Sequence, residues 1–212
     1  MISFWCKLLQ FPHKVSYKLY FLMYNVQLNN PRYKFSFISS IEGILQETGS
    51  FYIWSSQIIT SPRSLKLSIK RVLIDQFYQS WTASQNQSSK AEFYKIYKDK
   101  PHLDRYLIEL PLNLRIWLTR FKTTNHRLPI ETGRWSKIDR DNRLCKLCNI
   151  SIGNEYHFLL VCPFLSHLRT KYFPNYFCKY PTIEKFIYLM TTSYKPLMLN
   201  ISKYIKDGLC LM

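Results

Sequence analysis

Apolar residues recur every three or four positions along most of the chain, which is the spacing of an amphipathic helix. Residues 13–27 and 37–46 both show this spacing, and Gly49 after the second run predicts a helix end. The pattern contains no repeat and little strand-like alternation, so we predict a mainly α-helical fold. The positions expected to face a core are Val15, Leu19, Leu22 and Met23 in the first run, and Ile38, Ile41 and Leu45 in the second.

A longer helix is predicted to begin at Ser61-Pro62, because serine caps helices and proline suits the first helical turn. We expect it to end near Trp81. Residues 84–89 are all polar (SQNQSS) and predict a loop, after which residues 91–97 resume the helical pattern. The apolar stripe of the longer helix would comprise Leu65, Ile69, Val72, Leu73, Gln76 and Phe77.

The clearest helical stripe lies within residues 111–144. Leu114, Trp117, Leu118 and Phe121 occupy positions i, i+3, i+4 and i+7, which places them on one side of a helix. Arg115, Thr119 and Lys122 would share the other side, facing either water or the phosphates of a nucleic acid. Beyond this helix we predict a turn-rich connection containing Leu128-Pro129 and Gly133-Arg134-Trp135.

Composition narrows the classes of protein that fit. The 212 residues are 47% hydrophobic and 17% aromatic, which is enough to fold and argues against a disordered chain. Only five glycines occur, and no glycine-rich phosphate loop is present, so nucleotide-binding enzymes of that type are excluded. No apolar stretch approaches the ~20 residues of a membrane span, and no signal peptide is evident. We therefore expect an intracellular protein, nuclear or cytoplasmic, with no membrane partner and no small-molecule substrate.

The charge is strongly positive and spread along the chain. Thirty Lys and Arg against thirteen Asp and Glu give +17; residues 1–40 carry five basic and no acidic groups, and residues 111–144 carry eight and three. Such a field favours polyanions, although solubility alone is the other interpretation. If nucleic acid binds, we expect phosphate contacts from 111–144 and either base stacking or a core position for Trp135. The expected contacts are Arg115, Lys122, Arg127, Arg134, Lys137, Arg140 and Arg143.

Four residues predict a metal site. Cys145 and Cys148 are separated by two residues, and His157 and Cys162 follow at a spacing that can close a tetrahedron around one ion. Three thiolates and one imidazole would saturate a single zinc ion, so we expect a structural role rather than catalysis. On a straight helix His157 and Cys162 would lie about 140° apart, and we expect a kink before Pro163 to bring them together.

The other candidate ligands are expected to stay outside this site. His167 could compete, but four ligands already saturate the ion. Cys6, Cys178 and Cys210 are taken as free thiols, because a reducing compartment disfavours disulfides.

The stretch around these ligands resembles a known family. Residues 126–135 (HRLPIETGRW), 143–149 (RLCKLCN) and 153–158 (GNEYHF), followed by Cys162, are similar to the zinc-binding region at the C-terminal end of reverse transcriptases of LINE-type (non-LTR) retrotransposons. Residues 4–5, 74–76 with Trp81, and 115–124 are more loosely similar to the preceding connector. The family's paired catalytic aspartates are absent, since no Asp-Asp pair occurs.

The resemblance implies a truncated, non-catalytic copy of the polymerase's C-terminal end. It implies a helical connector over residues 1–110, a basic helix with a CCHC zinc knuckle over 111–175, and a helical tail over 176–212. The implied partners are RNA or DNA, bound without sequence specificity, and a full-length polymerase. Two alternatives remain open: a zinc-stabilised structural or protein-interaction module, and a decayed element copy with no selected function.

Overall fold

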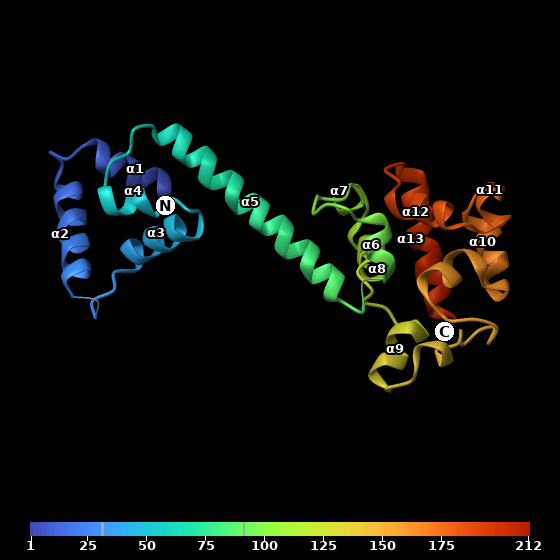
Figure 1. Ribbon diagram of the computed structural model, residues 1–212. Coiled ribbons are helices and arrows are strands. Elements are labelled where there is room, and N and C mark those ends of the chain that lie inside the picture. Colours follow the sequence, from blue (N-terminus) through green and yellow to red (C-terminus); the bar gives the residue numbers. More distant parts are fainter. Residues whose placement is uncertain (31, 91) are drawn as a thin grey trace. The chain divides into compact units, whose positions relative to one another are not determined.

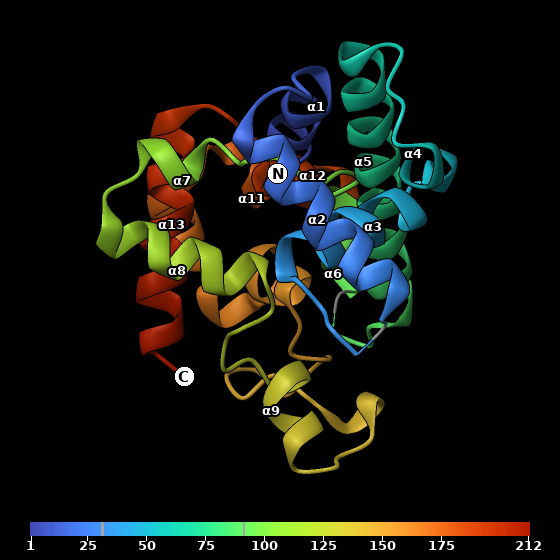
Figure 2. The same ribbon diagram turned by 90° about the vertical axis from the view of Figure 1, so that its left-hand side faces the viewer.

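The computed structural model describes residues 1–30, 32–90 and 92–212 and is helical throughout (Figures 1 and 2). The chain forms two compact units, Met1–Ser80 and Trp81–Met212. No strand occurs in the described ranges; Leu144 and Ile152 form an isolated antiparallel bridge. The predicted mainly α-helical class is confirmed. The three-part division expected from the resemblance concerns the origin of each segment and stays a prediction.

The core of the first unit contains two buried tryptophans, Trp5 and Trp54. Trp5 donates a hydrogen bond from Nε1 to the Tyr20 hydroxyl at 2.8 Å, and Tyr20 donates to Gln57 Oε1 at 2.7 Å. Burial raises the pKa of Tyr20 to about 12, so this chain of bonds keeps its proton at neutral pH. The helices of the unit are α1 (Ile2–Gln10), α2 (Val15–Asn29), α3 (Ser36–Glu47), α4 (Phe51–Ser56) and α5 (Pro62–Gln87), which continues past Ser80.

Helix α3 follows the sequence pattern closely. Ile38, Ile41 and Leu45 are fully buried, and the chain leaves the helix at Gly49 with φ +70°. The Ser50 amide donates to the Leu45 carbonyl at 2.7 Å, which satisfies an acceptor left free by the end of the helix. The predicted helix and its glycine stop are confirmed.

Helix α2 buries a different side from the one predicted. Val15, Leu19 and Leu22 are exposed, whereas Tyr20 and Tyr24 are buried against Trp54 and its neighbours. The predicted inward stripe is therefore wrong for this helix. The reason is that α2 is apolar on both sides, and the aromatic side buries more surface than the aliphatic side.

Helix α5 begins as predicted, since the Ser61 hydroxyl accepts a bond from the Ser64 amide at 3.3 Å. Only the first part of its stripe is buried, at Leu65 and Ile69, while Phe77 is exposed. The helix also continues to Gln87, so the predicted loop over 84–89 is wrong for residues 84–87. Serine, glutamine and asparagine lower helix propensity only slightly, and no glycine or proline ends the helix. Of the predicted run 91–97, Ala91 lies outside the described residues.

The second unit packs around α8 and α13, which lie side by side in both ribbon views (Figures 1 and 2). Tyr204 of α13 is fully buried and donates from its hydroxyl to the Phe158 carbonyl at 2.7 Å. Gly208, one turn later, leaves room for the Phe158 ring, because a Cβ there would lie 2.7 Å from Phe158 Cζ. The elements of the unit are α6 (Glu92–Tyr97), α7 (Tyr106–Glu109), α8 (Leu112–Lys122), α9 (Pro129–Trp135), η1 (Arg140–Asn142), η2 (His157–Val161), η3 (Pro163–Leu165), α10 (Ser166–Tyr172), α11 (Asn175–Cys178), α12 (Ile183–Thr191) and α13 (Lys195–Cys210).

The stripe predicted for α8 faces the core, with Leu114, Leu118 and Phe121 buried and Trp117 partly buried. Lys122 is the exception to the pattern. It is buried, so its predicted position on the solvent side of the helix is wrong. Its long stem lets Nζ reach Asp104 Oδ2 at 2.7 Å.

Two buried lysines share the Asp104 carboxylate. Lys98 also bonds to it, and the side chains of Lys98 and Lys122 are only 7% and 6% exposed. Burial alone would raise the pKa of Asp104, but hydrogen bonds from Lys122 and Lys98 outweigh burial and lower it. For Lys122, burial lowers the pKa more than Asp104 raises it. Because two cations act on this one anion, the Asp104 carboxylate stays ionised at neutral pH.

Within the described residues, no helix combines the length and the apolar character needed to cross a bilayer.

We expect Asp104→Asn to destabilise the protein by about 3 kcal/mol at neutral pH, because two buried ammonium groups lose the carboxylate that they share. Urea unfolding measures this loss. Since folding lowers the pKa of Asp104, its stabilising effect exists above the usual aspartate pKa of about 3.9 and disappears as the pH falls further. Asp99→Asn, at an exposed position five residues away, is the control, and an equal effect of both variants would contradict the prediction.

Candidate metal centre

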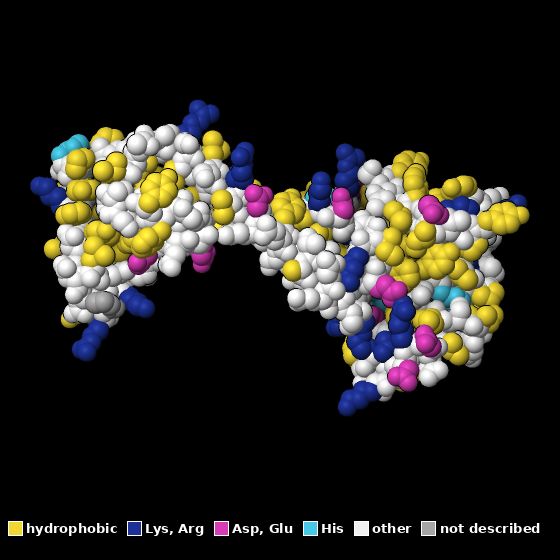
Figure 3. Space-filling model, viewed as in Figure 1, with side chains coloured by type: hydrophobic (Ala, Val, Ile, Leu, Met, Phe, Trp, Pro, Cys, Tyr) yellow, Lys and Arg dark blue, Asp and Glu magenta, His cyan; other side chains and the backbone are white. Residues whose placement is uncertain are grey.

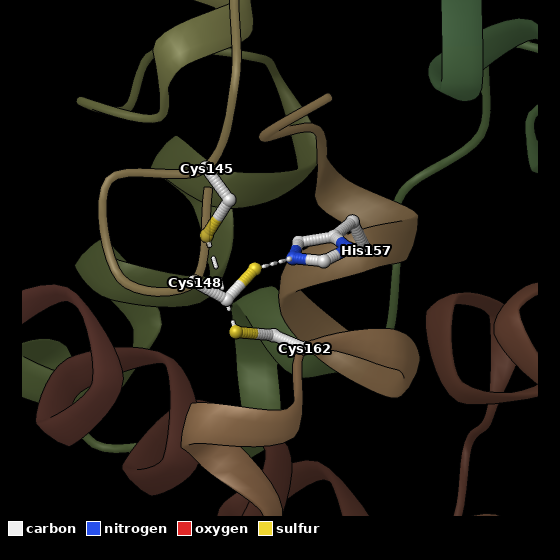
Figure 4. A group of neighbouring side chains, drawn as sticks. All are labelled: Cys145, Cys148, His157 and Cys162. Atoms are coloured by element: carbon white, nitrogen blue, oxygen red, sulfur yellow. Dashed lines mark hydrogen bonds between the residues drawn. The ribbon is translucent and has the colours of Figure 1, made fainter. Parts of the chain in front are cut away.

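The structure brings all four predicted ligands together. One ligand atom from each of Cys145, Cys148, His157 and Cys162 lies within 4.8 Å of the others. The sulfurs of Cys145 and Cys162 are 3.9 Å apart, and Cys148 Sγ lies 3.3 Å from His157 Nε2. Figure 4 shows the three sulfurs and the imidazole pointing toward one another, two from a loop and two from η2 and its end. This cluster can hold a metal ion.

The two measured separations fit a tetrahedral ion. Bond lengths of about 2.3 Å to sulfur and 2.0–2.1 Å to nitrogen place two sulfurs about 3.8 Å apart and a sulfur and a nitrogen about 3.5 Å apart. The observed 3.9 and 3.3 Å are each within a few tenths of an ångström of these values. An ion could therefore enter with only small side-chain movements.

A tight loop presents the first two ligands. The Cys145 amide donates to the Ser151 carbonyl at 2.9 Å, and the Asn149 amide donates back to the Cys145 carbonyl at 2.8 Å. Asn149 has φ +53°, a left-handed conformation that asparagine tolerates better than most residues. These bonds hold Cys148 within the turn, so both thiols point to the same side.

Gly153 allows this loop to lie against α9. A Cβ at Gly153 would be 2.7 Å from the Pro129 ring and 3.0 Å from the Cys145 Cα, so a larger residue would push them apart. The Gly153 carbonyl also accepts from the Ile130 amide at 3.1 Å. Gly153 is therefore needed for the close packing of the loop against α9.

The second pair of ligands depends on an unusual helical turn. Element η2 is a π-helix, and the Cys162 amide donates to the His157 carbonyl at 2.7 Å, an i to i+5 bond. The wider winding places residues five apart nearly above one another. The helix then ends at Cys162, where ψ is 117°. The predicted break before Pro163 is present, but the π-turn is the larger cause of the convergence.

Ser151 and Asn154 orient His157. The Ser151 hydroxyl lies 2.7 Å from His157 Nδ1, and Asn154 Oδ1 accepts from the His157 amide at 2.8 Å. When the Nδ1–H group donates to the Ser151 hydroxyl, the lone pair of a neutral imidazole lies on Nε2, the atom nearest to Cys148. Burial, and then the charge of Arg169, lowers the pKa of His157, which keeps the ring neutral and able to bind metal.

Arg169 of α10 stabilises the end of η2, next to the ligand Cys162. It is buried and donates to the carbonyls of Leu160 and Cys162, two acceptors at the end of η2. Three thiolates around a divalent ion leave a charge of about −1, so a nearby guanidinium also suits the occupied site. Ser151, Asn154 and Arg169 were not predicted from the sequence, because no spacing rule connects them with the ligands.

A buried pair supports η2 from its first turn. His126 Nε2 lies 2.9 Å from Glu155 Oε1, with side chains 0% and 6% exposed. His126 is thus a core residue that ties the start of α9 to the ligand-bearing turn. Its ring also packs against Phe121 of α8, with centroids 5.5 Å apart.

The thiols differ in how readily they lose a proton. Burial, with a smaller contribution from Cys145, raises the pKa of Cys162 to about 12. Burial also acts to raise the pKa of Cys148, but hydrogen bonds from the Ile150 amide and the neighbouring thiols outweigh it and lower the value. Metal binding must therefore displace protons, and it weakens as the pH falls.

The remaining cysteines and His167 lie outside the cluster. His167 is exposed, and its Nδ1 contacts the Phe164 carbonyl at 3.2 Å. Comparison with protein-family models, curated proteins and solved structures gives no match to this chain.

Several of the predicted phosphate-binding residues have internal partners instead. Arg115 donates two bonds to the Leu110 carbonyl, at 3.2 and 2.9 Å. Arg143 donates to the carbonyls of Ile138 and Ile130 at 2.9 and 3.0 Å, and its stem passes over Gly133, where a Cβ would lie only 2.6 Å away. Gly133 lies inside α9, so the predicted turn-rich connection is partly helical.

Two more arginines lie next to acidic groups. Arg134 bonds to Glu131 at 3.1 Å and to the Ser89 carbonyl at 3.0 Å, and Arg140 bonds to Glu92. Burial raises the pKa of Glu131, while Arg134 opposes the shift. Lys122 is buried beside Asp104 as described. These side chains hold the fold together as well as carrying charge.

Arg127, Trp135 and Lys137 remain exposed around α9. Trp135 is 67% exposed, so the core alternative does not hold for it and its ring is open to a ligand. No ion pair within the described residues involves Arg127 or Lys137.

We expect Ser151→Ala to weaken metal binding about 10- to 100-fold, because the imidazole loses the partner that fixes its tautomer. Titration with Co²⁺, followed by visible absorption, measures this affinity. Ser193→Ala removes a hydroxyl from a distant exposed loop and should leave the affinity unchanged. Equal affinities for Ser151→Ala and the unmodified protein would contradict the assigned role.

Proposed function

We propose that the protein is a non-catalytic module in which one zinc ion stabilises a small basic region that binds nucleic acid. The observation that carries the proposal is the convergence of three thiols and one imidazole at separations close to those of a tetrahedral zinc site. Thiolate-rich ligand sets favour zinc over magnesium or calcium. Four protein ligands leave no position for water or substrate, which supports a structural ion.

The nucleic-acid part of the proposal depends on exposed groups near the metal centre. Residues 111–144 carry net +5, and Lys and Arg side chains gather over α9 in Figure 3. Arg127 and Lys137 lack ion-pair partners in the described chain, and Trp135 offers an open ring face for a base. Such contacts would bind without sequence specificity. We leave Lys122 out of this set because Asp104 holds its ammonium in the interior.

The resemblance over residues 126–162 supports an origin in the C-terminal zinc-binding region of a LINE-type reverse transcriptase. In that case RNA or DNA, and a full-length polymerase, are the partners we propose. One observation favours the alternative of a protein-interaction or structural module. Arg115, Arg134, Arg140 and Arg143 all bond within the protein, which leaves fewer cations free than the sequence suggests.

We expect the purified protein to contain one zinc ion per chain, and chelation to lower its thermal midpoint. Removing a ligand present at about 1,000 times its dissociation constant costs about 4 kcal/mol, a shift on the order of 10 °C. Cys148→Ser should lose the ion and show the lower midpoint without chelator. Cys178→Ser removes a cysteine outside the cluster and is the matched control. The zinc part of the proposal is disproved if the unmodified protein contains no zinc, or if chelation leaves its thermal midpoint unchanged.

We expect the double variant Arg127→Ala, Lys137→Ala to bind single-stranded RNA or DNA about 20-fold more weakly at 0.1 M salt. Each lost phosphate contact should reduce the slope of log affinity against log salt by about 0.7. Fluorescence anisotropy at several salt concentrations measures both quantities. Lys203→Ala, Lys206→Ala removes the same charge from exposed positions of α13 and should change the slope little.

Two further variants separate the contributions to binding. Trp135→Ala should weaken binding of single strands without changing the salt slope, because stacking releases no counterions. Arg143→Ala should lower stability more than affinity, since its guanidinium bonds to backbone carbonyls. If the zinc-loaded protein binds neither RNA nor DNA at moderate salt, the structural-module alternative replaces this proposal.

A further inference from the structure

Helix α2 of the first unit carries an exposed aliphatic stripe. Val15, Leu19, Leu22 and Val26 are 80%, 57%, 60% and 37% exposed, and they follow one another at intervals of four, three and four residues. This spacing places them on one line along a helix, over a length of about 16 Å. The stripe is thus a continuous apolar face that the unit itself does not cover.

The stripe is not a product of loose packing, because the opposite side of α2 is firmly held. Tyr24 packs edge-on against Trp54 with ring centroids 5.0 Å apart, and Tyr20 bonds to Trp5. A helix that is apolar on both sides is normally covered on both. Here the aromatic side meets the core, and the aliphatic side needs another apolar environment.

The charged side chains of α2 and of the residues before it are all basic. Lys14 and Lys18 lie beside it at the start of α2, and residues 1–40 contain five basic and no acidic side chains. Lys14 Nζ lies 4.5 Å from the centre of the Phe11 ring, another partly exposed apolar group. Hydrophobic and basic side chains both appear over α2 in Figure 3. The complementary surface must therefore be apolar and negatively charged.

We propose that α2 lies on the surface of an anionic lipid bilayer, with its aliphatic stripe at the boundary between headgroups and acyl chains. Lys14 and Lys18 would then meet the lipid phosphates. Nucleic acid offers no apolar surface for four aliphatic side chains. A protein partner fits less well, since the stripe lacks the Trp, Tyr and Arg that dominate protein interfaces. The sequence-based expectation of no membrane partner considered spanning segments, which this mode of binding does not need.

The proposal is tested by co-sedimentation of the zinc-loaded full chain with vesicles. We expect binding to vesicles of phosphatidylcholine and phosphatidylglycerol, and at least tenfold weaker binding to phosphatidylcholine alone. Leu19→Ser, Leu22→Ser should reduce binding to the mixed vesicles at least tenfold. Lys14→Gln, Lys18→Gln should reduce it by roughly fivefold per lysine, and added salt should have a similar effect.

Ile108→Ser, Leu112→Ser is the matched control, because it removes two exposed aliphatic side chains from the second unit. All of these positions are exposed, and thermal unfolding confirms that each variant still folds. No binding of the unmodified protein to mixed vesicles overturns the proposal, and so does an equal loss in the stripe and control variants. A stripe variant that dissociates a dimer while vesicle binding is absent would assign the stripe to a second copy of the chain. Zinc content and RNA binding are measured separately, so their failure does not affect this result.

Discussion

The hydrogen bond from the Cys162 amide to the His157 carbonyl is the constraint on which the second unit's candidate site depends. In an ordinary α-helix these two residues face different directions, and one ion could not reach both. The i to i+5 bond widens the turn, and the helix end at Cys162 completes the convergence with the loop that carries Cys145 and Cys148. A π-turn is less favourable than an α-turn, so neighbouring contacts must stabilise it.

Those contacts come from buried polar groups on separate elements. Arg169 satisfies two carbonyls at the end of η2, and His126 holds Glu155 at its beginning. Tyr204 of α13 bonds to the Phe158 carbonyl inside the turn. Each of these groups would be costly to bury without its partner, so the pairs stabilise the backbone of η2.

Some of this architecture could be predicted from the sequence, for physical reasons that are local. Pro62 restricts the backbone at its own position and Gly49 permits a positive φ at its own, and the two-residue gap between Cys145 and Cys148 allows a tight turn to present both thiols. The stripe of α8 was predictable because its four apolar residues share one side of the helix, whereas most charged and polar residues lie on the other. In each case the neighbouring residues carry enough information.

The features that were missed depend on contacts between distant residues. Periodicity cannot choose between two apolar faces of α2, and the aromatic side was buried instead. Lys122 finds Asp104 eighteen positions away, and Arg169 finds carbonyls at the end of another helix. Ser151 contacts His157 only because the loop and the π-turn have already brought them together. Such pairings follow from the three-dimensional fold and leave no spacing signal.

Net charge is likewise a poor guide to which cations contact a ligand, because contacts between distant residues decide which charged groups stay free. The segment around α9 has little regular structure between its short helices, and its arginines brace it by donating to carbonyls and carboxylates. A planar guanidinium with five donors suits this role, whereas a lysine offers a single compact charge. The arginines that bond within the protein still contribute to a long-range field that would attract a polyanion. In the proposed complex, close contacts would fall to the exposed Arg127 and Lys137, so attraction and binding would depend on different members of one basic segment.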